Sequence, residues 1–118
     1  NDSFYSEDGK RIYLFDIERI VLEDEMVAQC KAVAVQINGK FKPILHVVLQ
    51  KNGVTDAKTV IPRIYKKLSE QLPQNAVPVA YKLRQTLPVH PNGKRNVEAL
   101  KAENDGFVDL MGNGWRVR

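Results

Sequence analysis

The dipeptide Asn38-Gly39 lies between a run of alternating residues and a second run rich in apolar residues, and this arrangement constrains the fold more than any other feature. An Asn-Gly pair favours a two-residue turn because both central positions need a positive φ. The runs at 27–37 and 41–50 are therefore predicted to form an antiparallel β-hairpin. In the first run the residues expected on one face are Val33, Val35 and Ile37, and those on the other are the small residues Ala32 and Ala34, which allow close packing of a helix.

Two helices are predicted from apolar residues at helical spacing. The first has Leu14, Ile17, Ile20 and Val21 on one face, and the second has Val60, Ile61, Ile64, Leu68 and Leu72. Pro62 leaves two starts open for the second helix. With Thr59 as the N-cap, Pro62 falls in the first turn, where a missing N–H costs little. With Asp56 as the N-cap, Pro62 kinks the helix. Pro73 marks the end.

The remaining segments complete a small fold. Residues 78–83 are predicted to form a third strand, and residues 97–100 a last short helix. Residues 10–13 are predicted to pair with Phe4 and Tyr5 in an N-terminal hairpin. Pro43 cannot donate to a ladder, so it is expected at a sheet edge or near a strand start. The fold class is α+β, with a small mixed sheet of about three main strands plus the hairpin, and helices packed against it.

Composition fits one globular domain of 118 residues with a net charge of +4, the basic residues being spread along the chain. Cys30 is the only cysteine, so no internal disulfide forms, and its strand context predicts a small buried hydrophobe. We find no long apolar run and no signal peptide, so a cytoplasmic location is expected. The chain begins at Asn1 rather than Met, which suggests a piece of a longer protein.

The sequence lacks the residues that several common kinds of site require. His46 and His90 are the only histidines and Cys30 is near neither at ligand spacing, so no metal site is expected. His46 is predicted on the polar side of its strand, at the surface. The sequence contains neither a Gly-rich phosphate loop nor a serine nucleophile elbow.

The informative segment runs from Leu87 to Lys94, Leu-Pro-Val-His-Pro-Asn-Gly-Lys. It places a lysine directly after Asn92-Gly93, in a loop held by Pro88 and Pro91. A positive charge on a shaped turn is a candidate catalytic group, and a plain basic β-turn is the alternative.

This segment, followed by Ala99-Leu100, resembles the last core motif of the adenylate-forming acyl ligases, Leu-Pro-x-Thr-x-x-Gly-Lys. These are the acyl-CoA synthetases, the adenylation domains of peptide synthetases and the luciferases. Gly9-Lys10-Arg11-Ile12, followed by Asp16-Ile17-Glu18, resembles the family's Gly-x-Arg-Ile segment and the helix after it. The resemblance covers about residues 2–101, nearly all of the small C-terminal domain of these enzymes. It implies a lid domain at 1–103 and a tail at 104–118, which is either a short hairpin anchored by Trp115 or loose.

Departures from the family pattern occur around the lysine and before Gly9. His90 stands where threonine is usual, and Asn96-Val97 stands where Asp-Arg is usual. Ser6 and Asp8 replace residues that are often basic. The turn and its lysine are kept.

The resemblance implies an ATP-dependent ligase that activates a carboxylic acid as an acyl-adenylate and transfers it to a thiol. Lys94 would assist adenylation, supported by His90, Asn92 and Gly93. ATP and Mg²⁺ would be held mainly by an N-terminal adenylation domain absent from this chain, and the acceptor would be coenzyme A or the phosphopantetheine of a carrier protein.

Two further residues take roles from the resemblance. Gly9 would let the backbone approach the thiol, with a plain hairpin turn as its alternative. Asp2 would be the hinge between the two domains, with a disordered terminus as its alternative. On this basis the isolated chain is expected to be inactive.

The rival hypothesis is a free-standing interaction or RNA-binding module without catalysis. It finds little support, because Phe41 and Tyr81 are the only aromatic residues on the strands predicted for the main sheet, too few for a base-stacking platform. Nucleic acid is therefore not expected as a partner.

Overall fold

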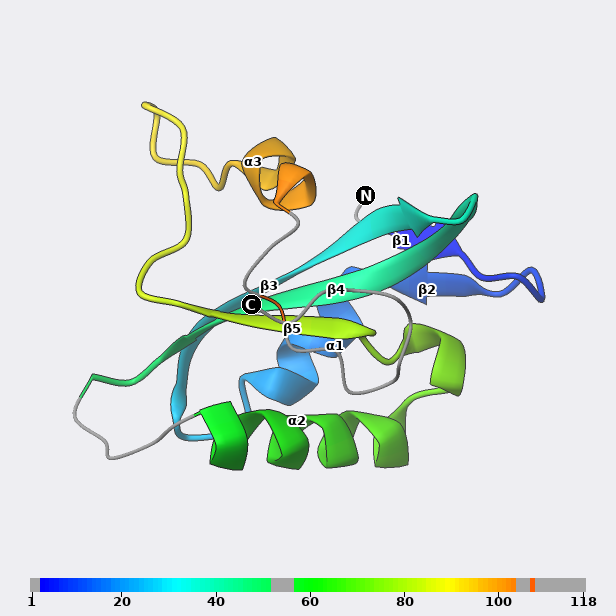
Figure 1. Ribbon diagram of the computed structural model, residues 1–118, viewed down its shortest axis with the longest axis horizontal. Helices are drawn as coiled ribbons and strands as arrows, with labels where there is room; N and C mark the ends of the chain where they lie inside the picture. Colours follow the sequence, from blue (N-terminus) through cyan, green and yellow to red (C-terminus); the bar gives the residue numbers. More distant parts are fainter. Residues whose placement is uncertain (1–2, 52–56, 104–106, 108–118) are drawn as a thin grey trace.

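A computed structural model describes residues 3–51, 57–103 and 107. A three-stranded sheet in the order β3-β4-β5 has helices α1 and α2 on one face and α3 on the other (Figure 1). A two-stranded ribbon, β1-β2, lies beside it. The predicted α+β class, with a mixed sheet and an N-terminal hairpin, is confirmed.

The predicted central hairpin is confirmed by strands β3 (Val27–Ile37) and β4 (Lys40–Leu49), which pair antiparallel. Asn38 and Gly39 form the turn with φ values of 53° and 81°, as the dipeptide predicts. Strand β5 (Ala80–Arg84) pairs parallel with β4 and makes the sheet mixed.

Pro43 lies near the start of the central strand, which is one of the two places predicted for it. It is opposite Ala34 of β3, and pairing with β5 begins only at the next residue, Ile44. The carbonyl of Pro43 accepts a hydrogen bond from the N–H of Val79 at 3.0 Å. The missing N–H of the proline therefore falls where the second ladder has not yet begun.

The first face of the sheet is covered by α1 (Leu14–Val21) and α2 (Ala57–Gln71). Both predicted apolar stripes are confirmed, and the small residues on this face of β3 let α1 pack directly against the strand. The buried members of this cluster include Leu14, Ile17, Ile20, Val21, Ala32, Leu45, Val47, Val60, Ile61, Ile64, Leu68 and Tyr81.

The start of α2 decides between the two alternatives for Pro62. The helix is already formed at Ala57, so the interpretation of Thr59 as the N-cap is wrong, and Pro62 is the sixth residue. Its ring is exposed, on the side away from the sheet. Burial of the apolar stripe on the opposite side offsets the backbone hydrogen bond that the proline removes. Asp56, the alternative N-cap, lies outside the described residues.

Short elements link these layers. Strands β1 (Ser3–Tyr5) and β2 (Arg11–Tyr13) form the predicted hairpin, which buries Phe4 and Ile12 in the first cluster. After α2, Pro73 precedes the 3₁₀ turn η1 (Gln74–Ala76), which leads into β5.

The second face is covered by α3 (Val97–Ala102), Leu87 and Phe107. His46 lies on this face and is fully buried, with its ring edge-on to Phe107 at 5.4 Å between centroids. The prediction of a surface histidine is therefore wrong. It assumed that the second face is open to water, whereas Leu87, Leu100 and Phe107 cover it.

Cys30 is buried, as predicted, and burial raises the pKa of its thiol to about 12, which makes it unreactive. Within the described residues, no helix combines the length and the apolar character that crossing a membrane requires.

We expect His46 to make the stability of the chain depend on pH. Burial lowers its pKa to about 4, and the nearby Arg84 adds to this effect. An unfolded chain binds the proton near pH 6.5, so stability is lost as the pH falls from about 6.5 to about 4, by roughly 3 kcal/mol. Urea unfolding across this range measures the loss.

The two histidines provide a matched pair for this test. His46→Leu is expected to flatten the stability profile between pH 4 and 6.5, and the exposed His90→Gln is expected to leave it unchanged. An unchanged profile in His46→Leu would assign the acid loss to other groups.

Candidate active-site turn

Residues 90–94 form a tight turn that presents Lys94. The N–H of His90 donates to the carbonyl of Lys94 at 2.7 Å, and the N–H of Gly93 donates to the carbonyl of His90 at 2.8 Å. Gly93 has a φ of +88°, which a residue with a side chain adopts only with strain. Asn92 Oδ1 accepts from the N–H of Lys94 at 3.0 Å. The backbone of Lys94 is thus held on both sides.

The C-terminal end of the turn is tied to α3. Val89 and Arg95 form a β-bridge, and the N–H of Asn96 donates to the carbonyl of Pro88 at 2.9 Å. The side chain of Asn96 then caps α3, accepting from the N–H of Ala99 at 3.0 Å. Asn96, a departure from the family pattern, therefore has a clear local role as a helix cap.

The other side of the loop is tied to the end of α3 by an ion cluster. Arg84, the last residue of β5, donates to both carboxylate oxygens of Glu103 at 2.6 Å and to the carbonyl of Thr86 at 3.0 Å. Lys82 also pairs with Glu103. Burial alone would raise the pKa of Glu103, but the bonds from Lys82 and Arg84 outweigh it and hold the pKa below its usual value. Because the three side chains are largely shielded from water, this pairing is stronger than a surface one.

Lys94 itself is exposed, and no described carboxylate pairs with it. A rigid backbone therefore carries a free ammonium group on a long stem. This is the property that the sequence predicts for a catalytic charge.

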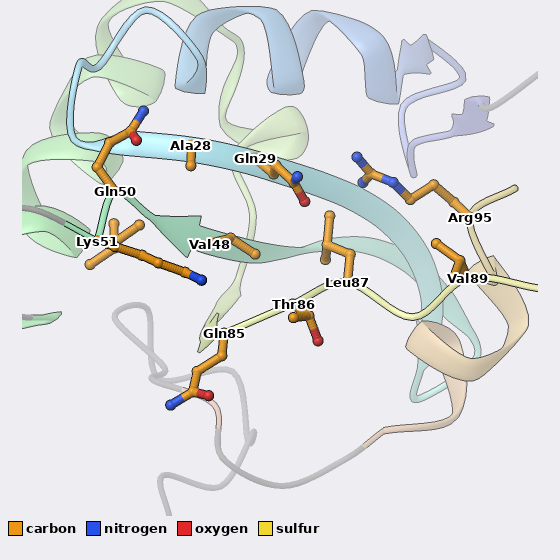
Figure 2. Close-up of a pocket in the computed structure, with 11 residues that line it drawn as sticks. Ala28, Gln29, Val48, Gln50, Lys51, Gln85, Thr86, Leu87, Val89 and Arg95 are labelled. Atoms are coloured by element: carbon orange, nitrogen blue, oxygen red, sulfur yellow. The ribbon is translucent and has the colours of Figure 1, made fainter. Parts of the chain in front are cut away.

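An open hollow of about 620 Å³ lies beside the turn (Figure 2). Val89 and Arg95, from the base of the turn, lie at one end of it, and Gln50 and Lys51 lie at the other. Its lining combines apolar side chains, amides and two cations, Lys51 and Arg95. The lining is Ala28, Gln29, Val48, Leu49, Gln50, Lys51, Gln85, Thr86, Leu87, Val89 and Arg95.

Gly9 lies in a second turn, between β1 and β2. The N–H of Ser6 donates to the carbonyl of Lys10 at 2.8 Å, and the N–H of Gly9 donates to the carbonyl of Ser6 at 3.0 Å. Gly9 has a φ of +84°, and the space around it is open. Its backbone is therefore accessible to a ligand, and its conformation favours glycine.

The structure brings His90, Asn92, Gly93 and Lys94 together, but not Gly9. In Figure 1 the turn between β1 and β2 and the yellow loop between β5 and α3 lie at opposite ends of the molecule. Asp2 lies outside the described residues, as does Trp115. Among the described residues, no group of His, Cys, Asp or Glu side chains is arranged to hold a metal ion.

Of the two strand aromatics considered for the RNA-binding hypothesis, Tyr81 is fully buried and Phe41 is exposed. A base-stacking platform on the main sheet therefore has one fewer ring than the sequence offered.

No protein-family model matches the chain, and no curated protein does. Solved structures do match. The amide bond synthetase McbA from Marinactinospora thermotolerans matches 86% of this chain and 20% of its own, with a TM-score of 0.73 and 19% identity. The o-succinylbenzoate CoA synthetase MenE from Bacillus subtilis matches 86% and 20%, with a TM-score of 0.69 and 20% identity.

The anthranilate CoA ligase AuaEII, solved with anthranoyl-AMP, matches 86% of this chain and 19% of its own, with a TM-score of 0.73 and 17% identity. This chain therefore has the fold of about a fifth of the length of each of these synthetases and ligases. The family resemblance inferred from the motifs is thus confirmed at the level of the fold.

Sequence reasoning missed Glu103, Lys82 and Arg84. Both cations lie in β5 at alternate positions, which is a pattern for one face of a strand. Nothing local to the sequence indicates that Glu103 reaches them, because the contact depends on where α3 ends.

We expect Glu103→Gln to loosen the loop that carries Lys94. Losing the carboxylate removes the anion that links Lys82 and Arg84 to the end of α3. Hydrogen exchange should rise at residues 85–96, by about tenfold for a loss of roughly 1.4 kcal/mol in local stability, and stay unchanged in β3 and β4. Glu98→Gln, which changes an exposed carboxylate within α3, is the control, and equal exchange in the two variants would contradict the role of the ion cluster.

Proposed function

We propose that residues 1–103 are the lid domain of an ATP-dependent ligase that joins a carboxylic acid to a thiol through an acyl-adenylate. The observation that carries the proposal is Lys94, an unpaired ammonium group on a hydrogen-bonded turn in a fold that adenylate-forming enzymes share. The chain spans about a fifth of those proteins, so the rest of the active site is assigned to a large N-terminal domain.

Adenylation explains why a mobile lysine is useful. A carboxylate oxygen attacks the α-phosphorus of ATP, the bond to the β-phosphate bridging oxygen breaks, and pyrophosphate leaves. Two anions must approach, and a cation placed between them offsets their repulsion where water is excluded. Lys94 is the group of this chain that takes that position, and its Nζ contacts the acyl oxygen and the phosphate. Mg²⁺ would be held together with ATP, mainly by the large domain, and would neutralise charge on the phosphates.

The turn residues position this charge rather than touch the substrate. The backbone N–H of His90, the amide of Asn92 and the positive φ of Gly93 hold the Lys94 backbone in place. A preorganised donor loses less free energy when it meets the charge that develops in the transition state.

The second half-reaction uses the other end of the domain. The lid rotates about Asp2, Lys94 leaves the active site, and the turn containing Gly9 enters it. The open backbone at Gly9 then lies against the thiol of coenzyme A or of a carrier protein's phosphopantetheine. The cytoplasm, where thiols stay reduced, suits this chemistry.

In the protein that contains this chain, Lys94→Ala should slow acyl-adenylate formation by about 10²–10³-fold, the cost of a lost oxyanion donor. Thioester formation from supplied acyl-adenylate should be largely spared. Pyrophosphate release measures the first step, and thioester yield from the adenylate measures the second.

Lys66→Ala, which removes an exposed lysine of α2 remote from both turns, is the control and should change neither step. Equal loss of both half-reactions in Lys94→Ala, or loss of neither, would remove the assigned role. Salt-dependent RNA binding by a protein that makes no adenylate would favour the interaction module instead.

A further inference from the structure

Gly-Lys occurs three times in the sequence, and two of these pairs belong to the same four-residue pattern. Asp8-Gly9-Lys10-Arg11 and Asn92-Gly93-Lys94-Arg95 differ only in their first residue, a carboxylate in one and the isosteric amide in the other. The second contains Lys94, the proposed catalytic lysine of adenylation. The lysine of the first, Lys10, has no role in the function proposed so far.

The two turns also have the same backbone geometry. In each, the residue three before the glycine donates to the lysine carbonyl, at 2.8 Å from Ser6 and 2.7 Å from His90. In each, the glycine has a φ between 84° and 88° and donates back to that residue. In each, the side-chain oxygen before the glycine accepts from the lysine N–H, at 3.4 Å for Asp8 and 3.0 Å for Asn92. Lys10 is thus presented as Lys94 is.

The lysine of the third pair, Gly39-Lys40, has a structural role. It lies in a two-residue turn, and Lys40 pairs with Glu7 at 2.9 Å, with Lys42 at 3.7 Å from the same carboxylate. The hydrogen bond from Lys40 holds the pKa of Glu7 below its usual value, so Glu7 is ionised and engaged. Lys40 therefore fastens the Gly9 turn to the main hairpin.

Lys10, by contrast, is exposed and forms no ion pair with the described residues. Asp8 interacts with the charge of Lys10 without forming an ion pair, and its Oδ1 accepts from the Ser6 hydroxyl and from the backbone N–H of Lys10. Lys10 and Lys94 are thus two free ammonium groups on equivalent turns. Because the turns lie at opposite ends of the molecule, one active site meets one of them at a time (Figure 1).

We propose that Lys10 is the catalytic cation of the second half-reaction, where its ammonium group stabilises the attacking thiolate. This inference rests on the proposed function and adds a residue to it. The thiol proton passes to solvent, and the sulfur forms a bond to the acyl carbon. The bond from that carbon to the phosphate oxygen breaks, and AMP leaves with the electron pair. A cation beside the sulfur lowers the pKa of the thiol and raises the thiolate fraction at neutral pH.

The test is thioester formation from supplied acyl-adenylate and coenzyme A by the protein that contains this chain, measured at pH 7 and pH 9. If Lys10 lowers the thiol pKa by about one unit from about 8.5, Lys10→Ala loses about tenfold in rate at pH 7. At pH 9 the thiol ionises without help, so the variant recovers to within about twofold of the parent. Lys10→Arg should restore the rate at pH 7, because it keeps the positive charge.

Lys66→Ala should match the parent at both pH values, and Lys10→Ala should leave pyrophosphate release unchanged. A Lys10→Ala variant that equals the parent at pH 7, or whose loss persists undiminished at pH 9, would overturn the role of Lys10. If the parent forms no adenylate, or Lys94→Ala forms it at the parent rate, the proposed function fails instead, and the two failures are distinguishable.

Discussion

Strand β4 is buried on both faces, and each face needs its own cover. Leu45 and Val47 are covered by α1 and α2, as in any two-layer α+β domain. Ile44 and Val48 need a second layer, which comes from α3, Leu87 and Phe107. The chain must therefore cross from β5 to the opposite side of the sheet, and the loop that makes this crossing carries Lys94.

This crossing explains how an exposed turn is held without a core of its own. Its two ends are fixed by buried elements, β5 on one side and Leu100 of α3 on the other, and Glu103 links those elements through Lys82 and Arg84. The β1-β2 turn is fixed differently, by the burial of Phe4 and Ile12 and by the ion pair of Glu7 with Lys40. The domain thus carries two firmly held turns, at opposite ends, with the sheet between them.

Much of this was predictable from local patterns. Asn38-Gly39 specified the central hairpin, and the periodicity of the apolar residues specified α1 and the buried face of α2, because each signal acts over a few residues. Long-range contacts were not predictable in this way. His46 shares a face of β4 with Ile44 and Val48, but the burial of that face depends on Phe107, which is distant in the sequence. The start of α2 was open because packing of its apolar stripe outweighs the local cost of Pro62.

In the candidate site, too, the local features were predictable from the sequence and the long-range contacts were not. The turn around Gly93 and Lys94 follows from the sequence Pro-Asn-Gly-Lys, whereas its anchoring by Glu103 is visible only in three dimensions. The equivalence of the Gly9 and Gly93 turns was present in the sequence as Asp/Asn-Gly-Lys-Arg, but a four-residue pattern carries weight only once both copies are seen to share one backbone geometry.

The central claim is that Lys94 enters an active site during adenylation. Its most direct test is amine labelling of the protein that contains this chain, followed by mass spectrometry, with and without saturating carboxylate and a non-hydrolysable ATP analogue. These ligands are expected to slow labelling of Lys94 several-fold and to leave Lys66 unaffected, since a lysine between two anions is shielded from the reagent. Labelling of Lys94 at the same rate in both conditions would contradict the claim.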